Sequence, residues 1–267
     1  MVRTVIVGAA GRMGKHLINN IAASDNMKLV GAIEIPSSPF IGMDAGLVAG
    51  CGKLEVNISS DLAKACGNAD AVINFSTSGV VEATRIAVAA GCAVVIGTTA
   101  LPEADKTELK NLAAGGGKIV FTPNMSIGVN LLFHLCRKAA KLLGNDYDIE
   151  VVEMHHNLKK DAPSGTAERL GEILCAARGL DYAADVRHGR EGIIGARTNH
   201  EIGMHSLRGG DVVGDHTVIF ATNGERIELT HKASSRDTFA KGALRAACFL
   251  MTAKPGMYDM QDVLNLK

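Results

Sequence analysis

Apolar and polar positions alternate along the first 125 residues in a pattern that is typical of repeated strand–helix units. Short β-branched runs predict buried strands, and amphipathic segments between them predict helices. The expected strands cover residues 4–7, 28–33, 71–75, 92–96 and 118–121, with helices after residue 14 and at 80–90 and 103–113, and a glycine-rich loop at 37–52. Such units assemble into a doubly wound parallel sheet, so we predict a Rossmann-type α/β domain.

The pattern changes after residue 125. Helices are expected at 127–143 and 164–178, and extended segments at 201–207, 211–221 and 226–231. The pair Asn223-Gly224 between the last two segments is a strong hairpin signal, and hairpin strands are antiparallel. We therefore predict a second α+β domain with a mixed or antiparallel sheet over residues 126–235. A final amphipathic helix at 237–251 predicts that residues 236–267 return to the first domain.

Composition and charge narrow the class of function. The chain of 267 residues has 28 basic and 28 acidic residues, no Trp and 4% aromatic residues. Nucleic acids and anionic membranes attract basic surfaces, and base stacking needs aromatic rings, so neither partner is expected. The longest apolar stretch, 86–96, is too short to cross a bilayer, and no signal-peptide pattern precedes the first strand. We expect a cytoplasmic protein that acts on a small molecule.

A glycine loop follows the first strand at once. Gly8, Gly11 and Gly14 are spaced G-x-x-G-x-x-G and lead into a helical pattern. Glycine lets backbone N–H groups approach a phosphate, and the positive end of the helix dipole faces the same anion. A tight turn required only for packing would use the same glycines. Glu34, 20 residues beyond Gly14, favours a dinucleotide because a carboxylate there binds the ribose hydroxyls.

The residue after Glu34 bears on which dinucleotide binds. A carboxylate repels the 2′-phosphate of NADP, whereas a neighbouring arginine would bind it. Ile35 occupies the neighbouring position, while Arg12 in the glycine loop is a cation that would soften the preference. NADH is therefore the expected preferred cofactor, with NADPH as the alternative.

Polar residues also follow other predicted strands. In a doubly wound sheet, ligands bind beyond the carboxyl ends of the strands. Segments 75–77, 97–99 and 122–125 stand at such ends, and the last two are natural walls of a nicotinamide pocket. Gly, Thr, Pro and Asn also end strands for reasons of turn geometry alone, so a purely structural interpretation stays open.

The most reactive side chains gather in residues 153–166, E-M-H-H-N-L-K-K-D-A-P-S-G-T, between a predicted strand and a predicted helix. Consecutive strand residues point to opposite faces, so His155 and His156 are poorly placed to chelate one ion and no metal is expected. Gly165 and Thr166 open the helix, where N–H groups and the helix dipole suit a carboxylate. Hydride transfer leaves negative charge on the acceptor, and histidine and lysine would supply the proton and the cation. A core histidine, a solvated histidine and surface lysines are the plainer alternative.

The motif E-x-H-H-x-x-K-x-D-A-P-S-G-T-A resembles the signature of the dihydrodipicolinate reductases, also called 4-hydroxy-tetrahydrodipicolinate reductases, of lysine biosynthesis. Similar segments extend over nearly the whole chain: G-A-A-G-R-M-G at 8–14, V-I-G-T-T at 95–99, N-M-S-I-G-V-N at 124–130, G-D-H-T-V at 214–218 and E-L-T-H-K-A-S-S-R at 228–236. The resemblance implies reduction by NAD(P)H of a cyclic imine dicarboxylate, derived from 4-hydroxy-tetrahydrodipicolinate, to tetrahydrodipicolinate. It also implies a homotetramer assembled through the sheets of the second domain.

The resemblance implies roles for individual residues. His155 would handle a proton, Lys159 would donate one, and His156, Gly165 and Thr166 would bind the substrate. The dinucleotide would contact Gly8, Ala9, Ala10, Gly11, Arg12, Met13, Glu34, Gly97, Thr98, Thr99, Thr122, Pro123, Asn124 and Met125. Lys160 does not fall on the family's lysine position. Residues 1–125, completed by 236–267, would then be the dinucleotide-binding domain, and 126–235 the substrate-binding and oligomerisation domain.

Two other functions agree with parts of the sequence. A dehydrogenase of aspartate-derived aldehydes shares the two-domain plan, but it predicts a nucleophilic cysteine at a helix start or a lysine pair without H-H-x-x-K. The six cysteines lie in apolar or loop contexts without an obvious base and are expected to be reduced thiols. A regulator that binds NAD without turning it over would not need the histidine and lysine array.

Overall fold

The computed structural model describes residues 1–99 and 101–267, and the chain divides into two units. The first unit contains residues 1–127 and 236–267, and the second contains residues 128–235. None of the helices in the described ranges combines the length and the apolar character that crossing a bilayer requires.

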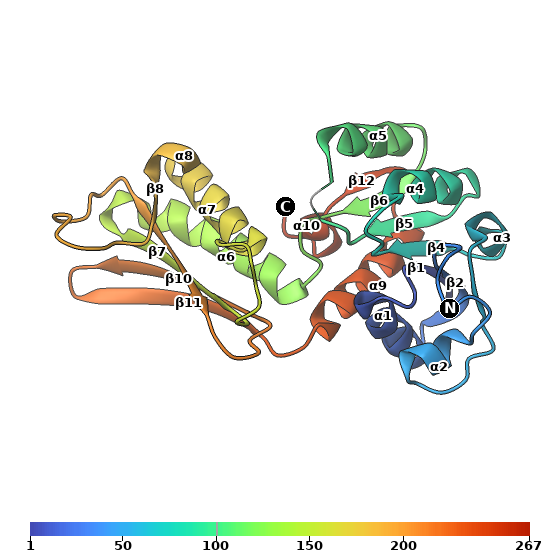
Figure 1. The fold of residues 1–267 in the computed structure, drawn as a ribbon. Coiled ribbons are helices and arrows are strands. Elements are labelled where there is room, and N and C mark those ends of the chain that lie inside the picture. Colours follow the sequence, from blue (N-terminus) through green and yellow to red (C-terminus); the bar gives the residue numbers. More distant parts are fainter. Residues whose placement is uncertain (100) are drawn as a thin grey trace. The chain divides into compact units, whose positions relative to one another are not determined.

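Seven strands form the sheet of the first unit, in the order β12-β6-β5-β4-β1-β2-β3 (Figure 1), and every neighbouring pair is parallel. The strands are β1 (Val2–Val7), β2 (Met27–Ile33), β3 (Ile58–Ser59), β4 (Ala71–Asn74), β5 (Ala93–Ile96), β6 (Lys118–Phe121) and β12 (Gly256–Tyr258). The predicted Rossmann-type fold is therefore confirmed. The strand order reverses between β1 and β4, and sheets of this kind bind ligands at the carboxyl ends of the strands that flank such a reversal.

Helices cover both faces of this sheet. One face carries α1 (Arg12–Ala22), α2 (Ala45–Ala49), α9 (Asp237–Thr252) and α10 (Met260–Val263), and the other carries α3 (Leu62–Cys66), α4 (Val80–Ala89) and α5 (Glu103–Ala114). Within β1, Ile6 packs into the first core, whereas Val5 and Val7 pack into the second. Because both faces are covered, the strands are apolar at nearly every position instead of alternating.

The expected loop at residues 37–52 is wrong in part, because α2 lies inside it. The carboxylate of Asp44 caps this five-residue helix by accepting hydrogen bonds from the N–H groups of Gly46 (2.9 Å) and Leu47 (3.1 Å). A helix of little more than one turn has no room for an apolar period, so its cap is the only sequence signal.

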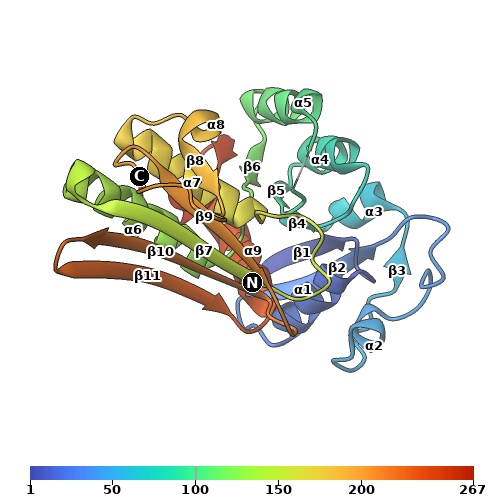
Figure 2. The ribbon, with the colours of Figure 1, turned by 60° about the vertical axis from the view of Figure 1, so that its left-hand side comes forward.

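The second unit is built on a five-stranded sheet of order β11-β10-β7-β9-β8 (Figure 2). Its elements are α6 (Ile127–Leu143), which begins at the last residue of the first unit, the 3-10 turn η1 (Gly144–Asp146), β7 (Asp148–His155), α7 (Gly165–Arg178), α8 (Tyr182–Asp185), β8 (Val186–His188), β9 (Ile202–Arg208), β10 (Gly214–Thr222) and β11 (Glu225–Ala233). β10 is antiparallel to β7 and β11, whereas β9 is parallel to β7 and β8. The sheet is mixed, as predicted. β9 and β10 follow each other in the chain but lie on opposite sides of β7.

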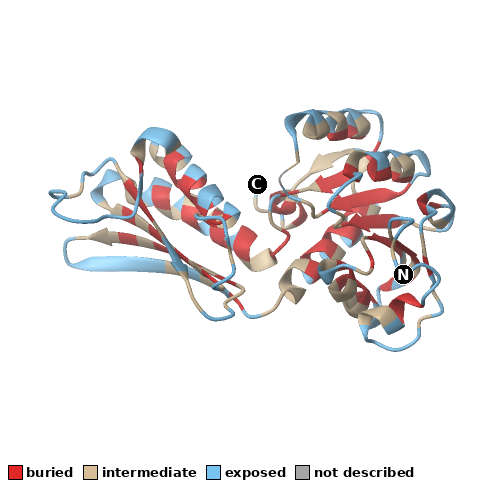
Figure 3. Cartoon of the chain, in the orientation of Figure 1, coloured by how far each residue is buried: buried red, intermediate tan, exposed pale blue. Residues whose placement is uncertain are grey.

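Alternate residues of β7 face the helices of the second unit. Ile149 and Val151 pack against α6 and α7, whose outer residues are exposed (Figure 3). The next two residues on the same side are Glu153 and His155, and both are buried. Ionisable groups are costly to bury without partners, so the end of β7 must supply partners for this pair.

Candidate active site

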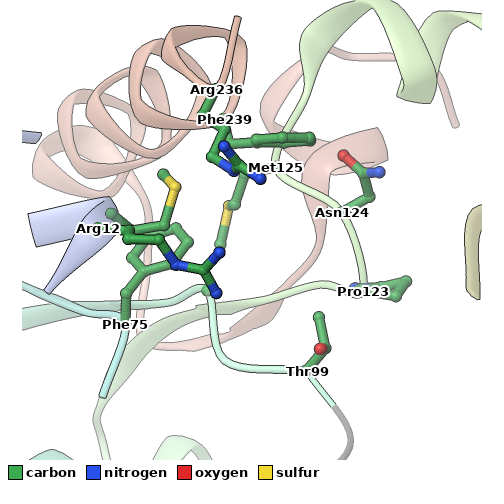
Figure 4. Close-up of a pocket in the computed structure, with 10 residues that line it drawn as sticks. Arg12, Phe75, Thr99, Pro123, Asn124, Met125, Arg236 and Phe239 are labelled. Atoms are coloured by element: carbon green, nitrogen blue, oxygen red, sulfur yellow. The ribbon is translucent and has the colours of Figure 1, made fainter. Parts of the chain in front are cut away.

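A pocket of about 320 Å3 opens at the carboxyl ends of β1, β4, β5 and β6 in the first unit. Its walls are Arg12, Met13, Phe75, Gly97, Thr99, Pro123, Asn124, Met125, Arg236 and Phe239. The guanidinium groups of Arg12 and Arg236 are directed into this space (Figure 4). The fold thus brings part of the glycine loop together with the two strand-end segments that the sequence proposed as pocket walls.

Close packing explains two of the loop glycines. Gly8 has a φ of +80°, which residues with a Cβ adopt with strain. A Cβ on Gly14 would lie 2.1 Å from the carbonyl oxygen of Gly8, so α1 approaches the loop only because this position is glycine. The start of α1 is therefore held directly against the end of β1.

Most N–H groups of the loop are used within the first unit. Those of Gly8 and Ala9 donate to the carbonyl oxygen of Ile33 at 2.9 and 3.1 Å, and that of Ala10 donates to Glu34 Oε1 at 2.8 Å. The first N–H groups of α1, which begins at Arg12, are the loop's donors for an anion, because a helix has no internal acceptor for them. In the described part of the chain, the N-cap residue Gly11 has no side chain that could cap this end of α1.

Some residues at the ends of β5 and β6 make hydrogen bonds that hold the local backbone and do not line the pocket. Thr98 Oγ1 donates to the carbonyl oxygen of Ser76 at 2.6 Å, and Thr122 Oγ1 donates to that of Asn124 at 3.4 Å. A Cβ on Gly97 would lie 2.0 Å from the ring of Phe75, so this glycine makes room for the ring in the pocket wall. Thr98 and Thr122 are not among the residues that line the pocket, unlike their neighbours Thr99 and Pro123.

Arg236 and Phe239, which stand at the start of α9, were not predicted as pocket residues. More than one hundred residues separate them from the other walls along the chain. A Cβ on Gly242 of α9 would lie 1.8 Å from the carbonyl oxygen of Met125, which shows how closely this helix backbone approaches the pocket wall. A glycine in the middle of an otherwise apolar helix was the available signal, because glycine weakens a helix unless packing requires it.

In the second unit, His155 is joined to a buried carboxylate. Its Nδ1 lies 2.5 Å from Glu153 Oε2, and Glu153 is fully buried. Arg208 on β9 donates to both carboxylate oxygens at 2.9 Å, and the backbone N–H of Ser164 donates to Oε1 at 3.2 Å. Strand pairing produces this group, since β9 places Arg208 beside His155.

The charges of this group are set by opposing effects. Burial raises the pKa of Glu153, but hydrogen bonds from Arg208 and His155 outweigh it, so the pKa lies below its usual value and the group is a carboxylate. Burial lowers the pKa of His155, and Glu153 partly opposes this by stabilising the imidazolium. The net effect lowers the pKa of His155, so the neutral imidazole is favoured.

The remaining residues of the stretch follow the end of β7. Lys159 Nζ contacts both carboxylate oxygens of Asp161, at 2.9 and 2.8 Å, and its side chain is 20% exposed. His156 is half-buried and Lys160 is exposed. The backbone N–H of Lys159 donates to the carbonyl oxygen of His156 at 3.1 Å, so the two lie in one turn.

Ser164 caps the helix that Gly165 and Thr166 begin. Its hydroxyl accepts from the N–H of Ala167 at 3.3 Å and lies 3.1 Å from His216 Nε2 on β10. Apart from its chain neighbours and the backbone of α7, no described atom lies within 4 Å of the place where a Cβ on Gly165 would stand, so the helix start is open at this residue. Burial lowers the pKa of His216 to about 3, and its ring is therefore neutral. No role was predicted for His216 or Arg208 from the sequence.

The structure gives less support to a nucleophilic cysteine or to a metal site. All six cysteines are free, and none of them lines the pocket. Burial raises the pKa of Cys136 to about 12 and that of Cys175 to about 11, which keeps both thiols protonated and unreactive. Within residues 1–99 and 101–267, no three His, Cys, Asp or Glu side chains gather as a metal site would require.

Comparison with known proteins decides the family. The family described as "Dihydrodipicolinate reductase, N-terminus" matches residues 2–125, and "Dihydrodipicolinate reductase, C-terminus" matches residues 128–264. The chain belongs to the dihydrodipicolinate reductase family. It is an oxidoreductase of a pyridine-nucleotide-dependent family, and the resemblance noted in its motifs is confirmed.

Relatives in this family match the chain from end to end. A protein named 4-hydroxy-tetrahydrodipicolinate reductase from Hahella chejuensis is 50% identical over 268 residues, and one of the same name from Syntrophotalea carbinolica is 48% identical over 268 residues. Both alignments cover 100% of this chain and 100% of the relative. Among solved structures, "Dipicolinate bound Dihydrodipicolinate reductase from Paenisporosarcina sp. TG-14" has a TM-score of 0.78 at 24% identity and covers 98% of each chain, which supports the fold.

Proposed function

We propose that this enzyme uses NAD(P)H to reduce the cyclic imine dicarboxylate derived from 4-hydroxy-tetrahydrodipicolinate, and that it thereby forms tetrahydrodipicolinate for lysine and diaminopimelate biosynthesis. Full-length relatives carry the corresponding enzyme name. The observation that carries the proposal is the end of β7, where His155 is bonded to a buried carboxylate and is followed by a lysine and a helix N-terminus.

The first unit is the proposed dinucleotide-binding domain, and a bound nicotinamide would supply the hydride. The first N–H groups of α1 and its dipole suit the pyrophosphate, and Glu34 has a carboxylate oxygen beyond its bond to Ala10 for the ribose hydroxyls. NADH is the proposed preferred cofactor because the side chain of Ile35 is 59% exposed and offers no cation to a 2′-phosphate. NADPH remains the alternative because Arg12 lines the pocket.

The second unit is the proposed substrate-binding domain. A dicarboxylate would receive hydrogen bonds from the N–H groups of Gly165 and Thr166 at the start of α7, with His156 as a further contact. His155 would handle the proton through Nε2, because Nδ1 is occupied by Glu153. Lys159 would donate a proton and balance the charge that develops on the substrate nitrogen.

Assembly and location extend the same proposal. We expect a homotetramer formed through the sheets of the second unit and a cytoplasmic enzyme, as the family resemblance implies. Light scattering of the purified enzyme measures the assembly: a molar mass near four times that of one 27.9 kDa chain is expected, and a monomer would contradict it.

The test supplies the condensation product of pyruvate and aspartate semialdehyde and follows the oxidation of NADH and NADPH by absorbance. Consumption of cofactor with formation of tetrahydrodipicolinate is expected, faster with NADH. Folded enzyme that consumes neither cofactor would refute the reaction, and faster turnover with NADPH would refute the cofactor preference alone.

A further inference from the structure

Glu153 is the most completely bonded ionisable side chain of the candidate site. Its Oε1 accepts from Arg208 at 2.9 Å and from the backbone N–H of Ser164 at 3.2 Å, and its Oε2 contacts His155 Nδ1 at 2.5 Å and Arg208 at 2.9 Å. Four donors thus converge on two oxygens in a fully buried position. An ionised carboxylate suits these four donors because it is acceptor-only, whereas a protonated carboxyl group would add a donor of its own.

We infer that Glu153, held by Arg208, is a positioning residue for proton transfer: it fixes the Nδ1–H tautomer of His155 and leaves Nε2 as the reactive nitrogen. The inference rests on the proposed function of His155 and adds a task for two residues outside it. Because a carboxylate only accepts, the proton on Nδ1 must belong to the ring. The neutral ring then has its lone pair on Nε2, where it takes up or returns a proton.

The same carboxylate also sets the anion-binding turn. Ser164 donates its backbone N–H to Glu153 and caps α7 with its hydroxyl, so Gly165 and Thr166 begin the helix from a point that is tied to β7. Arg208 strengthens this link, because one guanidinium nitrogen also donates to the carbonyl oxygen of Asp161 at 2.6 Å. One buried carboxylate therefore places both the proton-handling ring and the proposed substrate carboxylate site.

A carboxamide cannot replace this arrangement. In Glu153→Gln, an NH2 group at the position of Oε2 faces His155 Nδ1 and donates to it, which moves the ring proton to Nε2. An NH2 group at the position of Oε1 faces donors from Arg208 and Ser164. Arg208 donates at both positions, whereas Ser164 donates only at Oε1, so the orientation with the NH2 group at Oε2 opposes fewer donors and is favoured.

The first measurement reads the tautomer directly. In enzyme labelled with 15N-histidine, the imidazole nitrogen shifts of neutral His155, assigned by their loss in His155→Asn, are expected to report Nδ1–H. In Glu153→Gln the Nε2–H tautomer is expected to appear. Neutral wild-type His155 protonated at Nε2, or an unchanged tautomer in folded Glu153→Gln, would overturn the inference. This measurement needs no substrate, so it is independent of the proposed reaction.

The second measurement is the pH profile of kcat/KM. The charged and titratable groups around the ring are Glu153, Arg208, Lys159 and His216. Glu153 stabilises the imidazolium, so Glu153→Gln is expected to move the limb that reports His155 to lower pH and to reduce kcat about 100-fold. The KM for NADH is expected to stay within about twofold, since the cofactor pocket lies in the first unit. A purely structural role would lower the amount of folded enzyme without moving the limb.

Glu150 supplies a matched control on the same strand. Its carboxylate binds Arg190 and lies 2.8 Å from His205 Nε2, which repeats the Glu, Arg and His grouping outside the candidate site. Glu150→Gln is expected to keep the pH limb in place. Arg208→Lys is a second variant, whose single ammonium cannot bridge both oxygens, and it is expected to shift the limb in the same direction by less. Equal limbs in all three variants would overturn the inference, and if Glu153→Gln unfolds, a limb in Arg208→Lys that matches the limb of Glu150→Gln would overturn it.

Discussion

If Nδ1 of His155 carries the ring proton, the atoms around Nε2 determine whether that nitrogen can exchange a proton. Nδ1 is engaged by Glu153, and the Nε2 edge lies against Gly214 at the start of β10. A Cβ at Gly214 would lie 3.0 Å from Nε2, closer than side chains ordinarily approach. The absence of a side chain at this position therefore keeps the proposed reactive nitrogen accessible.

Gly214→Ala is accordingly expected to lower kcat about tenfold or more while the fold persists, because the methyl group crowds the atom that exchanges the proton. Steady-state kinetics with NADH measure the effect. Gly209→Ala is the matched control, since its Cβ would meet only the flexible end of Met154 at 3.0 Å. Equal losses in the two variants would show that Nε2 is not the reactive nitrogen.

Two neighbouring lysines offer a second comparison of single residues. Lys159 is mostly buried and paired with Asp161, whereas Lys160 is exposed. We expect Lys159→Ala to reduce kcat about 100-fold, as the loss of a proton donor does, and Lys160→Ala to change it by less than about twofold. The two turnover numbers, measured at saturating NADH and substrate, decide the assignment, which equal effects would refute.

At the scale of the element, α9 is the helix on which the cofactor pocket depends most. Its start supplies Arg236 and Phe239, and Gly242 admits the carbonyl oxygen of Met125 to its surface. Alanine normally favours a helix over glycine by about 1 kcal/mol. At this position the clash at 1.8 Å must be relieved by moving either α9 or the pocket wall.

Gly242→Ala is therefore expected to destabilise the protein, by about 1–3 kcal/mol, despite the gain in helix propensity, and to raise the KM for NADH. Urea unfolding and steady-state kinetics measure the two effects. Gly115→Ala at the end of α5 is the control, because the nearest atom to its Cβ would be Asn111 O at an ordinary 3.4 Å. A stabilised Gly242→Ala variant with unchanged KM would mean that α9 does not support the pocket wall.

At the scale of the whole molecule, more of the fold than of the candidate site could be predicted from the sequence. The central strands of the first unit are apolar on both faces, whereas β7 and β10 of the second unit alternate, so their periods distinguish the two sheets before any contact is known. Short capped helices such as α2 were not predicted, because they are too short to show a hydrophobic period. The positions of β9 and β10 on opposite sides of β7 could not be predicted either, since the pairing of strands is set by the packed sheet.

The candidate site divides in the same way. Residues contiguous in a motif, such as His155 and Lys159, were proposed from the sequence, whereas Arg208, His216 and Arg236 come from distant segments that only strand pairing and chain return bring into place. Glu153 lay in the motif from the start. Its role stayed hidden because burial and four converging donors are properties of the folded chain.

The buried histidines of the second unit also make a prediction for the stability of the whole molecule. His216 keeps a folded-state pKa of about 3 because of burial, and the pKa values of His155 and His231 are lowered for the same reason. Below an unfolded-state pKa of about 6.5, these histidines are protonated in the unfolded chain but stay neutral in the folded chain. The contribution of the neutral His216 ring to the free energy of unfolding is thus fully present above pH 6.5 and is lost as the pH falls towards 3.

At pH 5 the contribution of His216 alone is a loss of about 2 kcal/mol relative to pH 7, at about 1.4 kcal/mol for each pH unit below the unfolded-state pKa. Urea unfolding at the two pH values measures it. His216→Gln, which keeps a polar partner for Ser164 without a group that titrates in this range, is expected to lose correspondingly less stability between pH 7 and pH 5. His200→Gln, at an exposed position, is expected to match the wild type. If His216→Gln loses as much stability as the wild type, the neutral buried ring does not cause the acid sensitivity.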